Sequence, residues 1–290
     1  GRCDEASDER EPRYYRCVEA GRPKRIDCDV AVYGGTPAGV TAAVQVARMG
    51  HKAVLLSFNR HVGGMTSGGL TATDVGNRTA IGGMAEELYT RLGKLRDYRP
   101  SEAESLYLRM LEEAGVQVLR ERCLASTLMK DGRLVSVTME TGETVKAAVF
   151  VDATYEGDLL AAAGVDFHVG REANSVYGEE WNGIQVGVLH HSHWFAKPID
   201  PYVRPGDPSS GLLPKISAAS PGKKGDGDRR VQAYCFRMCL TNFDENRIPF
   251  PKPDRYDAGQ YELMLRVLDS GWREMFRKFD SMPNHKTDTN

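Results

Sequence analysis

Two groups of closely spaced glycines are the residues whose types and spacing most clearly suggest chemistry. The first group follows the pattern G-x-G-x-x-G, in which a tight turn and a helix N-terminus receive a pyrophosphate. Thr36 stands at the middle position, where glycine is usual. The residues of this turn that we expect to bind a cofactor are Gly34, Gly35, Thr36, Pro37, Ala38 and Gly39. The pattern therefore predicts a dinucleotide-binding turn with one departure.

The second group follows a short apolar segment, Ala53–Leu56, which we interpret as the next strand. An acidic residue is expected at its end, about 20 positions after the turn, to hold a ribose, but Ser57 stands there. The loop that follows reads R-x-x-G-G; its glycines expose backbone N–H groups and its arginine supplies a cation that suits a phosphate. A solvated loop cation is the alternative for that arginine. The candidate cofactor-binding residues here are Ser57, Arg60, Gly63, Gly64 and Met65.

The elements that must position these glycines follow from the flanking residues. Cys28–Tyr33 is a short apolar run, as expected for a parallel strand that is buried on both faces. Small residues follow the turn at Ala42, Ala43 and Ala47, and they allow a helix to pack closely on the sheet. The order strand, glycine turn, helix and strand is that of a βαβ unit.

The chain resembles the FAD-dependent oxidoreductases of the glutathione-reductase-like flavoprotein class. More narrowly, it resembles a bacterial family that carries the label FAD-dependent oxidoreductase or xanthan lyase. The segments that carry the resemblance are VYGGTPAGVTAA, RHVGGMTSGGLTATDVG, FVDATYEGDLLAAAGV, VGREANSVYGEEWNG and QAYCFRMCLTNFDENRIPFPKP. They extend from about Asp29 to Asn290.

This resemblance implies that FAD is the cofactor and that the flavin transfers hydride or electrons to or from a small-molecule substrate. It also implies that Ala153 and Thr154 lie against FAD, and that the backbone near Leu124 approaches the adenine. Asp158 is a further cofactor-binding candidate, with a simpler alternative. It belongs to the first turn of an expected helix, where an acid is favoured by the helix dipole.

The predicted fold class is α/β: a Rossmann-like FAD-binding domain with a parallel sheet and a small β-meander, plus part of an α+β substrate domain. We expect a charged N-terminal extension at 1–27, an FAD-binding domain at 28–164 and a partial substrate domain at 165–290. D-G and T-G turns between alternating segments predict the meander over 124–147. Ser101 and Glu104 predict a capped helix start, and an apolar stripe predicts one long helix over 257–279.

Three residues of the second part are candidates for catalysis. His191 and His193 would share one face of a strand, where they could bind a metal or donate protons beside a flavin. A hydrogen-bonded structural pair is the alternative, and no third metal ligand is evident, so no metal is predicted. Arg237 could anchor a substrate carboxylate or pair with Asp244 or Glu245.

Composition narrows the classes of function. The 290 residues carry a formal net charge of −2, which gives no general electrostatic case for nucleic acid or an anionic membrane. No run approaches the roughly 20 apolar residues that span a bilayer. We expect a soluble protein, either cytoplasmic or exported after processing, whose oligomeric state the sequence leaves open.

The two ends of the chain suggest that it is a fragment. It begins with glycine, and it ends before the late G-D element with which related flavoproteins return to their cofactor. A truncated, non-catalytic nucleotide-binding module is therefore the alternative to an oxidoreductase. A polysaccharide lyase has less support, because a glycine-rich phosphate turn has no role in uronate elimination.

Overall fold

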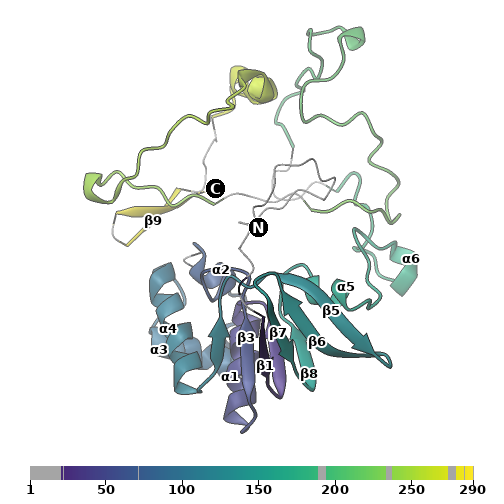
Figure 1. Ribbon diagram of the computed structural model, residues 1–290. Coiled ribbons are helices and arrows are strands. Elements are labelled where there is room, and N and C mark those ends of the chain that lie inside the picture. The colour runs from purple at the N-terminus through teal and green to yellow at the C-terminus, as the bar shows by residue number, and fades with distance from the viewer. Residues whose placement is uncertain are drawn as a thin grey trace. The chain divides into compact units, whose positions relative to one another are not determined.

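The computed structural model describes residues 21, 23–70, 72–188, 194–232, 237–273, 279–283 and 285–289 (Figure 1). The described residues divide into two compact units: the first runs to Asp166 and also includes Met282 and Pro283, and the second comprises the other residues from Phe167 onward.

The first unit is built on a parallel sheet of four strands. Their order is β4 (Gln117–Leu119), β3 (Ala53–Leu56), β2 (Val30–Tyr33) and β8 (Val149–Asp152). Every neighbouring pair is parallel. The predicted parallel sheet is confirmed, and the apolar runs of β2 and β3 are explained because both faces of these strands are covered.

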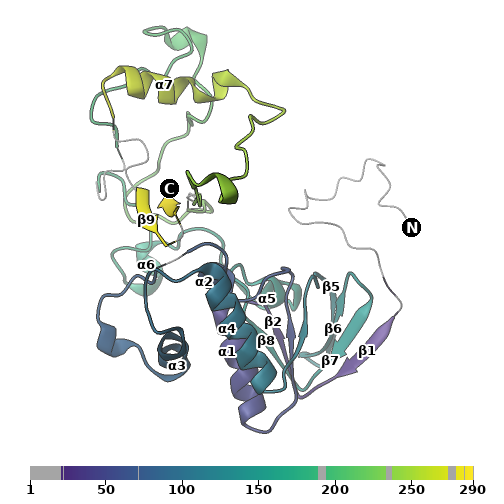
Figure 2. The same ribbon diagram turned by 90° about the vertical axis from the view of Figure 1, so that its left-hand side faces the viewer.

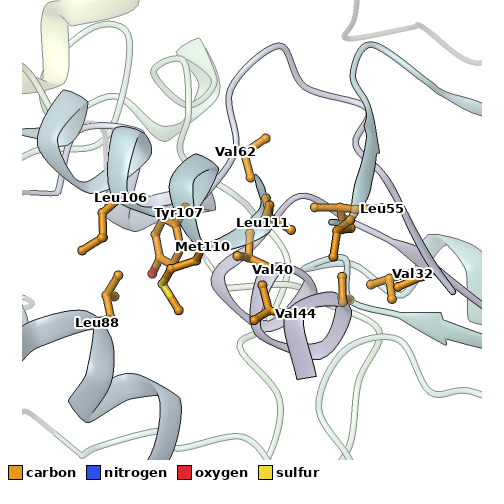
Figure 3. Close-up of a cluster of buried hydrophobic side chains, with 14 residues drawn as sticks. Val32, Val40, Val44, Leu55, Val62, Leu88, Leu106, Tyr107, Met110 and Leu111 are labelled. Carbon is orange, nitrogen blue, oxygen red and sulfur yellow. The ribbon is translucent and has the colours of Figure 1, made fainter. Parts of the chain in front are cut away.

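Three helices contribute to the hydrophobic core on one face of the sheet, α1 (Pro37–Arg48), α3 (Gly83–Leu92) and α4 (Pro100–Glu113). Alternate strand residues point toward them, and the small residues of α1 allow close packing. Figure 3 shows this cluster, which includes Val32, Leu55, Val40, Val44, Tyr107, Met110 and Leu111. The packing presents the N-terminus of α1 at the carboxyl end of β2, as a βαβ unit requires.

A second sheet covers the other face, as Figure 2 shows. Its order is β1 (Lys24–Asp27), β7 (Glu143–Lys146), β6 (Arg133–Met139) and β5 (Leu124–Lys130). Strands β5, β6 and β7 are antiparallel neighbours, which confirms the predicted meander. The turn between β5 and β6 places Asp131 and Gly132 at φ 51° and 73°, the left-handed values typical of a tight hairpin.

Two sequence-based expectations for the first unit are wrong in detail. Lys24–Asp27 is a strand that pairs in parallel with β7, and Ile26 is buried, so these residues are not part of a surface extension. Helix α4 begins at Pro100 and not at the expected cap: the Arg99 amide donates to the Glu102 carboxylate over 3.0 Å. The strand could not be recognised from the sequence, because Ile26 is its only apolar residue and the other three residues are charged.

Short elements complete the first unit: α2 (Gly64–Ser67), the 3-10 turn η1 (Arg78–Ala80) and α5 (Asp158–Ala162). The second unit contains α6 (Asn174–Tyr177), three 3-10 turns at Pro208–Ser210, Asp244–Asn246 and Ala258–Tyr261, helix α7 (Glu262–Asp269), and the pair β9 (Phe279–Met282) and β10 (Lys286–Thr289).

Irregular segments dominate the described part of the second unit, and a partly buried arginine holds one of them. Arg266 of α7 donates to the carbonyl groups of Asp200, Tyr202 and Val203. The single helix predicted over 257–279 is wrong, because α7 ends at Asp269 and Gly271 adopts φ 100°. None of the described helices is long and apolar enough to cross a membrane.

Candidate nucleotide-binding site

The turn between β2 and α1 is closed by an approach that only glycine permits. Gly34 has φ 117°, and a Cβ atom there would lie 2.5 Å from the Ala153 carbonyl carbon and 2.7 Å from the Thr154 amide nitrogen. The end of β2 therefore lies directly against the segment that follows β8. The sequence motifs predict that both segments contact one cofactor, and the structure brings the two segments together.

Thr36 has a structural function that explains its departure from the glycine pattern. It is the N-cap of α1, and its hydroxyl accepts from the Gly39 amide at 3.2 Å and donates to the Ala153 carbonyl at 2.7 Å. The side chain is almost fully buried. Thr36 thus accepts a hydrogen bond from a backbone N–H group at the helix N-terminus that would otherwise have no partner. It also links the helix to the segment that follows β8.

The R-x-x-G-G loop is held beside this turn by a residue that sequence analysis assigned to a helix cap. The Glu104 carboxylate accepts from the Val62 amide at 3.1 Å and lies 2.9 Å from His61 Nδ1. The Gly63 amide donates to the Gly35 carbonyl at 2.7 Å. The loop is consequently fixed to both α4 and the glycine turn.

Tyr155 is a residue of the candidate site that is not among the residues predicted from the sequence. Its hydroxyl accepts from the Met65 amide at 2.9 Å, and a Cβ atom at Gly64 would collide with that hydroxyl. The Tyr155 side chain therefore lies over the start of α2, next to Pro37. The Met65 amide therefore already has an oxygen acceptor within the protein.

Other donors at the turn have no protein partner. Among the described residues, the backbone N–H groups of Gly35 and Ala38 have no acceptor, although Gly35 is buried. Helix α1 has 12 residues and no acidic residue in its first turn, so the positive end of its dipole is not neutralised. Free N–H groups at a helix N-terminus are suited to a phosphate or pyrophosphate.

Three predicted cofactor-binding residues are already engaged with other groups. Ser57 is 1% exposed and its hydroxyl donates to the Asn59 carbonyl at 3.1 Å. Arg60 is exposed and lies 3.5 Å from the Glu121 carboxylate. The Leu124 amide donates to the Tyr33 hydroxyl at 3.0 Å. A ribose or an adenine would have to displace these bonds to use Ser57 or the Leu124 amide.

The segment after β8 is organised by its own side chains. The Thr154 hydroxyl donates to Asp152 at 2.7 Å and accepts from the amides of Gly157 and Asp158. Asp158 begins α5, consistent with the dipole alternative. Burial, together with the carboxylates of Asp152 and Glu156, raises the pKa of Asp158. This carboxyl accordingly binds a proton more readily than an ordinary aspartate.

The catalytic candidates are not assembled at this site by the described residues. His191 and His193 lie outside the described residues. The Arg237 guanidinium donates to both carboxylate oxygens of Asp288, at 2.9 and 3.0 Å, and not to Asp244 or Glu245. Asp288 is 6% exposed, so this pair fixes Arg237 to β10. Within the described ranges, no cluster of histidine, cysteine and acidic residues could hold a metal.

A parallel sheet with a glycine turn, free amides at the N-terminus of its first helix and a meander on the opposite face defines a dinucleotide-binding α/β protein. Within this class, the chain belongs to the FAD dependent oxidoreductase family, whose model matches residues 29–290. Family membership agrees with the resemblance that the sequence motifs carry.

Individual relatives are more distant. The chain is 27% identical over 196 residues to the tRNA uridine 5-carboxymethylaminomethyl modification enzyme MnmG of Desulfotalea psychrophila, a match that covers 56% of this chain and 30% of that protein. Among solved structures, L-proline dehydrogenase from P. horikoshii is 14% identical with a TM-score of 0.41, over 52% of this chain and 59% of the other. THI4 of Thermovibrio ammonificans is 19% identical with a TM-score of 0.39, over 50% and 66%. The chain thus spans less than a third of the curated relative's length.

Proposed function

We propose that this chain binds FAD at the N-terminus of α1 and forms part of an oxidoreductase that acts on a small molecule. The free amides of Gly35 and Ala38 carry this proposal, because they lie where a pyrophosphate would bind. Family membership specifies FAD as the dinucleotide. Gly34, Thr36, Pro37 and Gly39 shape the turn, and Ala153 and Thr154 form the adjoining wall.

In this arrangement each segment has a separate role. The N-terminus of α1 binds the pyrophosphate, and the amides of Gly64 and Met65 contribute further backbone donors, while the Gly63 amide stays bonded to the Gly35 carbonyl. Tyr155 holds the Met65 amide until a ligand oxygen takes its place, and its O–H group then donates to the ligand. Bound FAD supplies the ability to accept hydride or electrons, while the protein orients it and excludes water.

A small molecule is the substrate that we favour. The name of the curated relative concerns a tRNA uridine, but the net charge of −2 does not suggest a surface for a polyanion. His191 and His193 stay proposals for proton transfer. We do not propose Arg237 as the anchor of a substrate carboxylate, because its guanidinium is paired with the buried Asp288.

The test is a titration of the purified chain with FAD, followed by the fluorescence and visible absorption of the flavin. Ala38→Asp is the decisive variant, because residue 38 is exposed in the first turn of α1. An acid there favours the helix dipole and leaves stability equal or higher, yet it repels the pyrophosphate. We expect FAD affinity to fall at least about tenfold, a change of roughly 1.4 kcal/mol.

Ala38→Asn is the matched control, since it has nearly the same shape without the charge, and its affinity should stay within about threefold of wild type. Equal FAD affinity in Ala38→Asp and wild type would place the pyrophosphate elsewhere. Binding of ADP without binding of FAD would favour the non-catalytic nucleotide-binding module. A chain that binds neither would contradict the proposal.

A further inference from the structure

The carboxyl end of β3 lacks the acid that usually binds an adenosine ribose. Ser57 occupies that position, but its side chain points inward, and a Cβ atom at Gly35 would collide with its hydroxyl. The hydroxyl already donates to the Asn59 carbonyl at 3.1 Å. Ser57 therefore closes the core beneath the glycine turn, and the ribose position needs another acceptor.

A carboxylate lies beside this position, on the neighbouring segment that follows β4. The Ser57 amide donates to the Leu119 carbonyl at 2.8 Å, and the Ser57 carbonyl accepts from the Arg122 amide at 2.9 Å. Glu121 stands between these two anchors, and its own amide donates to the Asn59 carbonyl at 3.3 Å. The backbone therefore fixes Glu121 next to Ser57, which stands at the position where a ribose-binding acid is expected.

The Glu121 carboxylate is available to a ligand. Its side chain is 49% exposed, and its ion-pair partner among the described residues is Arg60, at 3.5 Å. An exposed pair at that distance is weak, and it leaves most of the acceptor positions of the carboxylate open. Arg60 orients the carboxylate. Because the pair is exposed to solvent, Arg60 does not cancel the negative charge of Glu121.

The backbone of Glu121 supports a functional reason for this residue. Its φ is 56°, in the left-handed region that glycine and asparagine tolerate better than glutamate. A position of this kind costs stability when a non-glycine residue occupies it, and such positions are concentrated at ligand sites.

We propose that Glu121 accepts hydrogen bonds from the two hydroxyls of the adenosine ribose of FAD, in place of an acid at position 57. A carboxylate has two oxygens and a ribose has two neighbouring hydroxyl donors, so the pair matches in number and in charge assistance. This inference rests on the proposed FAD site. It assigns one residue to the adenosine half of the ligand, separate from the pyrophosphate donors at α1.

The test compares ADP with 2′,3′-dideoxy-ADP, which lacks both hydroxyls, as competitors for FAD fluorescence on the full chain. Wild type should bind ADP about tenfold or more tightly than the dideoxy compound. Glu121→Gln should reduce this preference to less than about threefold, while its affinity for dideoxy-ADP stays unchanged. Its affinity for FAD should fall by about the same factor as its affinity for ADP. Flavin binding is the readout, and no turnover is needed.

Glu121→Gly provides a second variant that does not depend on a strained backbone, because glycine accepts φ 56°. It should lose the same preference and be at least as stable as wild type. Glu113→Gln is the control, since Glu113 is also exposed and paired with an arginine, Arg91, at 2.7 Å. It should keep the full preference for ADP.

The outcomes separate the two proposals. If wild type binds FAD and both Glu121 variants keep the preference for ADP, the role of Glu121 is refuted while the FAD site stands. If wild type binds neither FAD nor ADP, both proposals fail together.

Discussion

Single residues in this protein serve the site mainly through contacts that are distant in sequence. Thr36 departs from the glycine pattern, yet its hydroxyl reaches the Ala153 carbonyl, 117 positions away. Ser57 departs as well, and its buried side chain packs so close to Gly35 that a Cβ atom at Gly35 would collide with the Ser57 hydroxyl. Both departures suit packing, so neither by itself argues against nucleotide binding.

Cys28 allows a test of local burial at the residue scale. It is a free, half-buried thiol, and burial raises its pKa to about 11, with Lys52 opposing the shift. At pH 8 only about one thiol in a thousand would be ionised. We expect Cys28 to react with iodoacetamide far more slowly than the exposed Cys239, as followed by peptide mass spectrometry.

The rate of alkylation of Cys28 should rise about tenfold for each unit by which the pH is raised, as long as the pH stays below the pKa of the thiol. Similar rates for Cys28 and Cys239 at pH 8 would contradict the burial described for this thiol.

At the scale of elements, the close contact between α1 and the turn that precedes it shapes the candidate site. Gly39 is the residue on which this contact depends, because a Cβ atom there would collide with the Gly34 carbonyl oxygen and lie 3.2 Å from the Ala153 side chain. The helix N-terminus can approach the sheet only with glycine here, and its free amides then reach the ligand position.

Gly39→Ala should accordingly destabilise the first unit by about 2 kcal/mol or more, because backbone must move to accept one methyl group. Urea unfolding monitored by circular dichroism measures this change. Gly76→Ala is the matched control: a Cβ atom there meets nothing within 4 Å and φ is not positive, so stability should change by less than about 0.5 kcal/mol. Equal effects of the two substitutions would mean that the close contact does not hold.

At the scale of the whole molecule, one contribution to the loss of stability in acid comes from an ion pair that links the meander to the segment after β4. Glu143 is 12% exposed and accepts from Arg122 at 2.8 Å and from the Thr141 hydroxyl. Burial alone would raise the pKa of Glu143, but the hydrogen bonds from Thr141 and its own amide, and the charge of Arg122, bring that pKa below its ordinary value.

A carboxyl whose pKa is lowered by folding stabilises the protein above its unfolded pKa and loses that effect as the pH falls through the folded value. Glu143→Gln should therefore cost about 1–2 kcal/mol at pH 7, and its stability should converge with that of wild type below about pH 4. Urea unfolding at several pH values measures both. A constant difference between the two proteins across this range would exclude the linkage.

Features that depend on local rules can be predicted from the amino-acid sequence. Apolar runs gave strands β2 and β3, paired turn residues gave the hairpin at Asp131 and Gly132, and the glycine spacing located the turn before α1. Such patterns are readable because backbone sterics and side-chain periodicity act over a few residues. Motifs of this kind also indicated the family.

Only the tertiary structure decided which residues complete these elements. Strand β1 pairs with β7, more than a hundred positions away, through a segment with a single buried apolar residue. Glu104 and Tyr155 reach the second glycine loop from two separate segments, through bonds to Val62 and Met65, and Glu121 is bonded through its amide to Asn59. No local pattern specifies such partners, because they are chosen by packing and by the need of each polar backbone group for a partner.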